Sequence, residues 1–276
     1  MTELATLWRD EGRTIALVPT MGSFHAGHLA LMRQARQLSD QVVVSLFVNP
    51  IQFGPGEDLA TYPCDLQKDM HLAASVGVDV LYAPLAADMY PPGFQTTIRV
   101  AELGKGLCGA SRPGHFDGVC TVVMKLFQQA SPHLAIFGEK DFQQLAVIRR
   151  MARDLDLPVA IIAHPTVREK SGLAMSSRNS YLQEEEIEQA LCLYRAICFA
   201  REMVKASTVP LVAAEVCSKI IKNIQSTPGC DVEYVEIVDA DSLKSCETVN
   251  KNSRLIMAVR VNRKVRLIDN AGLVEL

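Results

Sequence analysis

The chain has 276 residues, of which 49% are hydrophobic, so it can bury a substantial core and is not an intrinsically disordered protein. The formal net charge is −3, and no polybasic run is present, which argues against a nucleic-acid binder because such proteins carry a basic stripe. This length predicts one large domain or two unequal domains that share an interface.

Charged side chains interrupt residues 1–13, which therefore lack the apolar core of a signal peptide. The longest strongly apolar run, residues 42–48, contains Ser45 and is far too short to cross a bilayer. We therefore expect a cytoplasmic protein without a membrane partner.

The chain contains eight cysteines, which raises the question of a disulfide framework. No pair has the C-x-x-C spacing of redox and metal sites, and the chain shows no signal-peptide pattern. Cys192, Cys198 and Cys217 also lie in apparently helical segments. We expect reduced thiols that act as small apolar packing residues.

In the first half of the chain, strand-like apolar runs alternate with helical patterns. Strands are predicted over residues 14–19, 41–48, 78–82, 134–137 and 159–163. A helix is predicted over residues 28–38, and others are expected before and after the fourth strand. This β-α-β alternation predicts an α/β fold, with a Rossmann-like, mainly parallel sheet flanked by helices. Ligands bind such sheets at the carboxyl ends of the strands.

The pattern changes after residue 179. Helices are predicted over residues 184–205 and 211–224, and strands over residues 232–238, 255–261 and 264–268. Asn262 and Arg263 separate the last two strands as a hairpin turn. We therefore predict a Rossmann-like domain over residues 1–179 and a smaller C-terminal α+β domain over residues 180–276.

The segment Met21-Gly22-Ser23-Phe24-His25-Ala26-Gly27-His28 follows the first strand, and a helix is expected to start at or near its second histidine. A helix N-terminus attracts phosphate through its free N–H groups and macrodipole. Two imidazoles three residues apart can add hydrogen bonds to the same anion. A pair of helix-capping or solvated histidines is the alternative, and a zinc pair lacks a third ligand nearby. The strand–glycine–helix context favours nucleotide phosphates.

A second polar loop, Met175-Ser176-Ser177-Arg178-Asn179, carries two hydroxyls and a guanidinium that can clamp pyrophosphate. Taken alone, this loop could equally be a domain linker with a helix cap. The first motif resembles the HxGH signature of the nucleotidyltransferase superfamily, whose members usually carry a second phosphate-binding loop downstream. The two motifs together therefore favour phosphate binding at both.

Three further stretches, residues 44–54, 137–145 and 165–169, narrow the resemblance. Together with Pro19-Thr20-Met21-Gly22 and the serine loop, they resemble the pantothenate synthetase family. The resemblance runs from about residue 14 to residue 182 and continues more weakly beyond. Five such stretches in the same order are a specific signal.

The resemblance implies a set of ligand contacts. The residues expected to contact ATP are Met21, Gly22, His25, His28, Gly138, Lys140, Asp141, Val167, Met175, Ser176, Ser177 and Arg178. Val167 would offer its backbone to adenine, and Asp141 would bind ribose. Gln52 and Gln144 would bind pantoate through neutral amides, with an exposed helix position as the alternative for Gln144. Arg112 would bind the carboxylate of β-alanine.

The resemblance also implies a reaction in two steps. The carboxylate of pantoate attacks the α-phosphorus of ATP, and the β-alanine amine then attacks the resulting pantoyl adenylate, which yields pantothenate and AMP. The expected catalytic residues, which stabilise charge on phosphate, are His25, His28, Lys140 and Arg178, aided by Mg²⁺. Asp69 is the candidate Mg²⁺ ligand, with a solvated helix carboxylate as the alternative. The loop 54–62 is expected to close over the intermediate.

Some positions depart from the family pattern. Cys64 stands where arginine is common, Phe24 stands where leucine is usual, and the segment before Thr14 is short enough for an N-terminal strand to be missing. The resemblance implies a homodimer. Two other functions are considered, namely a related nucleotidyltransferase that adenylates a phosphorylated coenzyme precursor, and a non-catalytic nucleotide-binding module.

Overall fold

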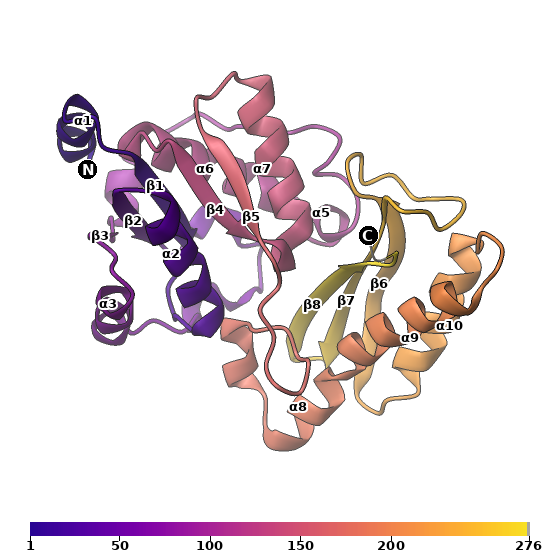
Figure 1. The fold of residues 1–276 in the computed structure, drawn as a ribbon. Helices are drawn as coiled ribbons and strands as arrows, with labels where there is room; N and C mark the ends of the chain where they lie inside the picture. The colour runs from indigo at the N-terminus through magenta and orange to yellow at the C-terminus, as the bar shows by residue number, and fades with distance from the viewer. Residues whose placement is uncertain (275–276) are drawn as a thin grey trace. The chain divides into compact units, whose positions relative to one another are not determined.

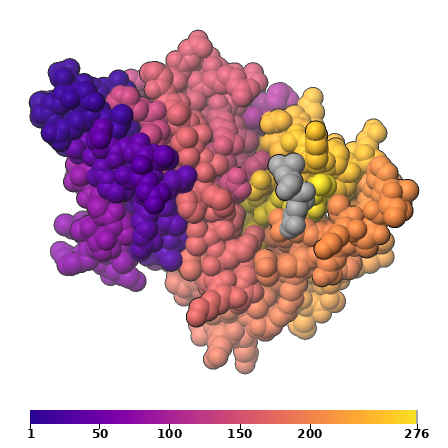
Figure 2. Space-filling view, viewed as in Figure 1, coloured from indigo at the N-terminus to yellow at the C-terminus, as the bar shows by residue number. Residues whose placement is uncertain are grey.

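The structure is a computed structural model that describes residues 1–274. The chain forms two compact units, the first covering Met1–Thr166 and the second beginning at Val167 (Figure 1). Figure 2 shows the surface of the first unit in indigo to pink and that of the second in orange to yellow. The division precedes the predicted boundary at residue 179, because residues 167–175 form a hairpin loop whose Arg168 pairs with Asp269.

The first unit contains a five-stranded sheet in the order β3-β2-β1-β4-β5. Its strands are β1 (Ile15–Thr20), β2 (Gln41–Leu46), β3 (Val80–Tyr82), β4 (Leu134–Gly138) and β5 (Ala160–His164). Every neighbouring pair is parallel, and the central strand β1 pairs with β2 on one side and with β4 on the other. The predicted Rossmann-like parallel sheet is confirmed.

Helices cover both faces of this sheet (Figure 1). They are α1 (Thr2–Asp10), α2 (Ala26–Leu38), α3 (Leu66–Ser75), α4 (Ala86–Met89), α5 (Cys108–Ser111), α6 (His115–Ala130) and α7 (Phe142–Asp154). Successive strand residues point to opposite faces. Accordingly, Ile15 and Leu17 pack in one core with α1, α6 and α7, whereas Ala16 and Val18 pack in a second core with α2 and α3. The segment before the first strand, where an N-terminal strand was expected to be missing, forms helix α1.

The second unit has a three-stranded antiparallel sheet in the order β6-β7-β8. Its elements are α8 (Glu184–Ala190), α9 (Cys192–Ala206), α10 (Ala213–Gln225), β6 (Cys230–Asp239), β7 (Ser253–Val261) and β8 (Val265–Gly272). The predicted turn is confirmed, since Asn262 and Arg263 have φ of 48° and 60°, as a type I′ turn requires. None of the helices in the described part of the chain is long and apolar enough to span a bilayer.

The prediction of a single helix over residues 184–205 is wrong, because the helix breaks at Leu191 between α8 and α9. Four consecutive residues, 190–193, are at most 9% exposed. One continuous helix presents only a stripe of residues to a core. A break between the two helices lets all four side chains face the core of the second unit.

Candidate active site

The loop that follows β1 is held in a strained conformation. Thr20 donates its hydroxyl to the backbone oxygen of Ser45 at 2.6 Å, which fixes the end of the strand. The next turn places Gly22 at φ 87° and Ser23 at φ 54°, in the left-handed region that favours glycine. A Cβ atom on Gly22 would lie 3.1 Å from the side chains of Asp69 and Leu46. Glycine at position 22 therefore fits both the backbone angle and the close packing.

The two histidines of the HxGH motif cap helix α2, which already begins at Ala26. Nδ1 of His25 accepts a hydrogen bond from the backbone N–H of Gly27 at 3.1 Å, and Nδ1 of His28 accepts one from the backbone N–H of His25 at 3.4 Å. The imidazole ring centroids lie 4.1 Å apart. The helix-capping alternative is therefore confirmed for the Nδ1 atoms, and the Nε2 atoms are left for a ligand.

Both imidazoles are neutral at pH 7. Burial, followed by the charge of Lys140, lowers the pKa of His25 to about 4. Burial, His25 and Lys140 lower the pKa of His28 to about 3. Because each Nδ1 accepts a hydrogen bond, the ring proton of each neutral histidine resides on Nε2. The pair thus offers two N–H donors without bringing positive charge.

A second segment of the site follows β4, the neighbour of β1 in the sheet. Gly138 ends this strand, and a short 3-10 helix carries Lys140 and Asp141, whose charged groups lie 3.9 Å apart. Lys140 lowers the pKa of both histidines, so its ammonium lies within electrostatic reach of them. In the order β3-β2-β1-β4-β5, the connections reverse direction between β1 and β4, which is where open α/β sheets bind ligands.

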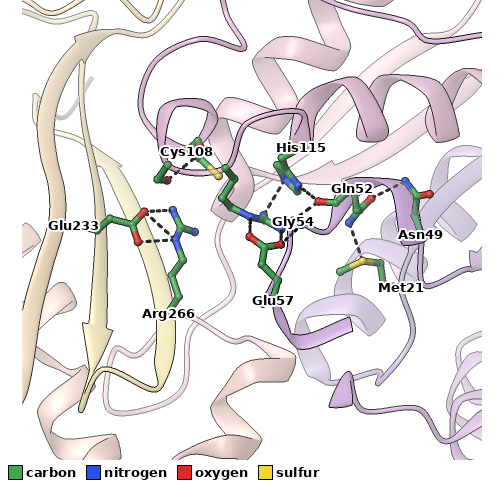
Figure 3. A network of polar contacts seen from close by, with 11 residues as sticks. Met21, Asn49, Gln52, Gly54, Glu57, Cys108, His115, Glu233 and Arg266 are labelled. Carbon is green, nitrogen blue, oxygen red and sulfur yellow. Dashed lines mark hydrogen bonds and ion pairs between the residues drawn. The ribbon is translucent and has the colours of Figure 1, made fainter. Parts of the chain in front are cut away.

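Gln52, a predicted pantoate ligand, is 8% exposed and is fixed by its neighbours (Figure 3). Its amide nitrogen donates to the sulfur of Met21 at 2.9 Å, and its amide oxygen accepts from Asn49 at 3.0 Å. Tyr90 donates its hydroxyl to the Asn49 side chain at 2.7 Å. The structure therefore brings Gln52 to the loop that follows β1. Asn49 and Tyr90 support it, and the sequence pattern predicted neither contact.

Arg112 is bonded within the chain. Its Nε and Nη2 atoms donate to the carboxylate of Glu57, both at 2.6 Å, and Nη1 donates to Nε2 of His115 at 3.0 Å. Although burial would raise the pKa of Glu57, the arginine outweighs it and holds that pKa below its usual value. His115 in turn donates Nδ1–H to the backbone oxygen of Gln52 at 2.8 Å. In the structure, Arg112 therefore binds the chain's own carboxylate.

Sequence reasoning also missed Glu57 and His115. A histidine three residues after an arginine, at the start of a helix, is the available signal for His115. Burial and the neighbouring Arg112 lower the pKa of His115 to about 4, so it is neutral at pH 7. Glu57 carries no comparable signal, because its partner lies far away along the chain.

Gln144 lies on α7, half-buried, so an exposed helix position does not describe it. Among residues 1–274, no hydrogen-bond partner for its side chain is present. The preceding Gln143 is 5% exposed and binds the backbone of Leu103, Gly106 and Cys108. Gln143 therefore stabilises a loop, whereas the amide of Gln144 is available to a ligand.

Asp69, the candidate Mg²⁺ ligand, lies on α3 and is 0% exposed, so the alternative of a solvated helix carboxylate is wrong. One carboxylate oxygen accepts the backbone N–H of Ser23 and the other that of Phe24, both at 2.7 Å. Within the described residues, no group of three or more His, Cys, Asp or Glu side chains could hold a metal ion. Both oxygens of the Asp69 carboxylate are therefore hydrogen-bonded to the backbone of the HxGH loop.

The remaining predicted ATP contacts come together within the second unit. Met175 donates its backbone N–H to the backbone oxygen of Val167 at 3.0 Å, which closes the hairpin loop. Ser176 caps a short 3-10 helix, Ser177–Tyr181, by accepting the N–H of Arg178 at 3.3 Å. The helix-cap alternative thus describes Ser176 correctly, and Ser177 and Arg178 form the first turn of this short helix.

The eight cysteines are free thiols in the structure. Cys64 is exposed and lies between the loop 54–62 and α3, where it cannot serve as a packing residue. Phe24 is 4% exposed, and its ring centroid lies 5.6 Å from that of His28. The phenylalanine therefore packs directly against one of the two histidines.

The parallel sheet, with paired histidines at its β1–β4 switch point, is typical of nucleotide-binding proteins of the HxGH nucleotidyltransferase class. A family model described as pantoate-beta-alanine ligase matches residues 1–272. The chain belongs to this family, as the sequence motifs predicted.

Similar proteins carry the same description. A pantothenate synthetase of Heliobacterium modesticaldum is 54% identical and covers 94% of this chain and 92% of its own length. The crystal structure of pantothenate synthetase from Thermus thermophilus has a TM-score of 0.91 at 45% identity, covering 95% of this chain and 94% of that one. A pantoate-beta-alanine ligase of Francisella tularensis, complexed with beta-gamma ATP and beta-alanine, has a TM-score of 0.80 at 36% identity, covering 98% and 95%.

Proposed function

We propose that this chain condenses pantoate with β-alanine, using ATP, and releases pantothenate, AMP and pyrophosphate. The observation that carries the proposal is the pair of neutral histidines, His25 and His28, held at the β1–β4 switch point near Lys140. Relatives named pantothenate synthetase at about half identity support the same reaction. The solved relative complexed with beta-gamma ATP and beta-alanine supports the choice of substrates.

In the proposed first step, the carboxylate of pantoate attacks the α-phosphorus of ATP. The Nε2–H groups of His25 and His28 and the ammonium of Lys140 donate to phosphate oxygens on which charge grows. Arg178, with Ser176 and Ser177, binds the leaving pyrophosphate through a guanidinium and hydroxyls. Pantoyl adenylate results, and its acyl group is now attached to a competent leaving group.

Pantoate is held by neutral amides in this proposal. One N–H of the Gln52 amide bonds Met21, so the second N–H can bind an oxygen of pantoate. Gln144 offers an amide without a partner among the described residues. Neutral ligands suit the step because they leave the nucleophilic carboxylate without a counter-charge to weaken it.

The remaining ATP contacts are assigned by the family resemblance. Met21, Gly22 and Gly138 would lie against the phosphates through their backbone, and Asp141 would bind ribose. In the second unit, Val167 would bind adenine through its backbone, next to Met175, with which it already shares a hydrogen bond.

In the second step, the amine of β-alanine attacks the activated carbonyl and AMP leaves. Arg112 can bind the β-alanine carboxylate only if Glu57 releases it, because four of its five N–H groups are already bonded. Glu57 belongs to the loop 54–62. We therefore propose that this exchange of carboxylates accompanies movement of that loop.

Mg²⁺ would accompany ATP by charge compensation, with water and phosphate oxygens as its main ligands. Asp69 does not fit a ligand role, since both of its oxygens accept backbone N–H groups and its side chain is fully buried. A homodimer located in the cytoplasm is proposed on the family resemblance alone, and light scattering of the purified chain measures the oligomeric state.

The decisive test is AMP release from ATP and Mg²⁺ in the presence of pantoate, with and without β-alanine. AMP that requires both substrates and appears in equal amount with pantothenate supports the proposal. A nucleotidyltransferase for a phosphorylated precursor would instead retain AMP in its product. A non-catalytic nucleotide-binding module would bind ATP and release no AMP under either condition.

A further inference from the structure

Asp69 stands apart from the other carboxylates of the first unit because it receives two consecutive backbone N–H groups while fully buried. It projects from α3, whereas its partners Ser23 and Phe24 belong to the loop between β1 and α2. Both hydrogen bonds measure 2.7 Å, the short distance expected when the acceptor is charged. The contact therefore ties an element outside the motif to the backbone of the HxGH loop.

The loop needs such a partner. Ser23 has φ 54°, a conformation that residues other than glycine adopt only when their surroundings enforce it. The N–H groups of Ser23 and Phe24 are directed at Asp69, so without this carboxylate one buried and one partly buried donor would lose their acceptor. A Cβ atom on Gly22 would lie 3.1 Å from the same carboxylate, closer than an ordinary van der Waals contact.

The contact also determines where the histidines lie. His25 follows Phe24 directly and is the N-cap of α2, and His28 is bonded to the backbone of His25. A rotation of the backbone at Ser23 would therefore move both Nε2 atoms together. Displacements of the order of 1 Å at a catalytic group are enough to lower rates by about a hundredfold.

We propose that Asp69 is a positioning residue, which holds the HxGH loop in its ATP-binding conformation by accepting the N–H groups of Ser23 and Phe24, and that it does not ligate Mg²⁺. The inference rests on the proposed function for the identity of the ligand, ATP. Its geometric content, a carboxylate that orders a loop, is independent of the reaction.

The test compares wild type with Asp69→Asn, whose side chain can accept one of the two N–H groups but presents an amide donor to the other. ATP affinity is measured by calorimetry in EDTA and again with saturating Mg²⁺. We expect ATP binding to weaken by about tenfold or more under both conditions, since a hydrogen bond to a charged group is lost. A loss seen only with Mg²⁺, or no loss under either condition, would overturn the proposal.

Asp79→Asn is the matched control. Asp79 accepts a backbone N–H, that of Val42, at 2.7 Å and pairs with Arg36, but it precedes β3 and so lies at the opposite end of the parallel strands from the HxGH loop. This variant should lose stability and keep its ATP affinity. A similar loss of affinity in Asp79→Asn would show that the effect of Asp69→Asn is general destabilisation.

Amide hydrogen exchange of the wild-type chain keeps the proposal testable if Asp69→Asn does not fold. The amides of Ser23 and Phe24 should exchange slowly without ATP, and Mg²⁺ alone should not change their rates. Rapid exchange, or a change on adding Mg²⁺, would contradict the assignment. If the chain binds ATP but forms no pantothenate, the proposed function fails while these measurements still decide the role of Asp69.

Discussion

In both histidines of the HxGH motif, Nδ1 has a structural role and Nε2 is left for a ligand. In each ring Nδ1 accepts a backbone N–H of the helix cap, and the proton lies on Nε2. A neutral donor needs no counter-ion when the site is empty, so the site avoids the cost of burying two imidazolium ions beside Lys140. In the proposed function, His25 and His28 act as oriented N–H donors, and Lys140 supplies the charge.

Because the two ring nitrogens have different roles, two substitutions of His28 should differ in their effects on kcat and on stability. Asn places an acceptor near the position of Nδ1 and lacks the distal donor, whereas Gln keeps a donor near the position of Nε2. We expect His28→Asn to lower kcat by about a hundredfold with little change in stability, because one donor to developing charge is lost. His28→Gln should retain more activity and unfold more easily. Equal losses of kcat in the two variants, measured beside urea unfolding, would contradict these different roles.

The position of the motifs at strand ends was predictable, because the segments Met21 to His28 and Gly138 to Asp141 adjoin strand-like runs in the sequence. The side chains that hold these motifs in place were not predictable. Asp69 meets Ser23 and Phe24 from a separate helix, and local pattern does not encode such a contact. The capping role of the histidines was available only as an alternative, since whether a ring faces its own backbone or a ligand depends on the angles at Ser23.

Among the elements, the loop 54–62 is tethered by one carboxylate. Glu57 accepts from Arg112 and also from the backbone N–H of Gly54, so a single side chain closes the loop on itself and fastens it to the end of α5 (Figure 3). The pair is mostly buried, with side-chain exposures of 13% and 24%, so removing one partner should cost more than at a surface ion pair.

Glu57→Gln should release this loop. The neutral amide holds Arg112 less tightly, so we expect faster proteolysis within residues 54–62 and a KM for β-alanine that falls several-fold as Arg112 becomes available. Steady-state kinetics and limited proteolysis measure the two effects. Asp154→Asn, which breaks an exposed ion pair with Arg150, should change neither. An unchanged or higher KM for β-alanine in Glu57→Gln would remove the carboxylate exchange from the proposal.

In the second unit, the hairpin loop 167–175 is fastened by a buried ion pair. Both Nη atoms of Arg168 donate to Asp269 on β8, at 2.7 Å and 2.9 Å, and Asp269 is 1% exposed. The arginine also lies over the ring of Tyr194. The pair therefore fixes the loop that presents Val167 and leads into the serine loop.

Asp269→Asn should destabilise the chain by about 3 kcal/mol, because removing one partner of a buried pair leaves the other charge uncompensated. Urea unfolding measures this loss. Asp231→Asn is the control within the same unit, since Asp231 pairs with Arg263 on the surface, where exposures are 57% and 88%. We expect no measurable change for the control. Equal stabilities of the two variants would show that the Arg168 pair does not fasten the loop.

The break between α8 and α9 shows why helix bounds in this unit were not fully predictable. The amphipathic pattern continues across Leu191, and neither glycine nor proline interrupts it. The break follows from packing, because four consecutive side chains are buried in the core of the second unit. Such a requirement arises from tertiary packing, and a propensity argument along one segment does not contain it.

For the molecule as a whole, three neutral histidines, of which His115 is buried and His25 and His28 are half-buried, make stability depend on pH. His25, His28 and His115 have pKa values lowered to about 4, 3 and 4, against 6.5 for an exposed ring. Protons therefore bind the unfolded chain more readily below pH 6.5. The contribution of the neutral rings to stability is complete above that pH and is lost progressively as the pH falls toward 4.

We expect the free energy of unfolding to fall between pH 7 and pH 4.5, with His115 alone accounting for about 2 kcal/mol of the pH-dependent loss. His115→Asn should be less stable at pH 7 and should show a shallower decline. His71→Asn is the control, because His71 is exposed on α3. Parallel declines for His115→Asn and wild type, followed by urea unfolding, would show that His115 does not contribute.

The overall architecture was predictable from alternation, because a parallel sheet with helices on both faces is what β-α-β repetition produces. The order of the strands was not, since alternation is compatible with several orders. Nor did the sequence place the division at Thr166, because the hairpin loop joins the second unit through Asp269, which lies near the end of the chain.

The central position of β1 in the sheet determines when the site forms during folding. Ala16 of β1 pairs with Val42 nearby in the sequence but also with Leu134, so half of the neighbours of β1 are synthesised much later. Pairings between distant segments form slowly. A nascent chain that has formed β1, β2 and β3 would already carry both histidines and would still lack Lys140. Competence to bind ATP should therefore appear late in folding, when β4 docks.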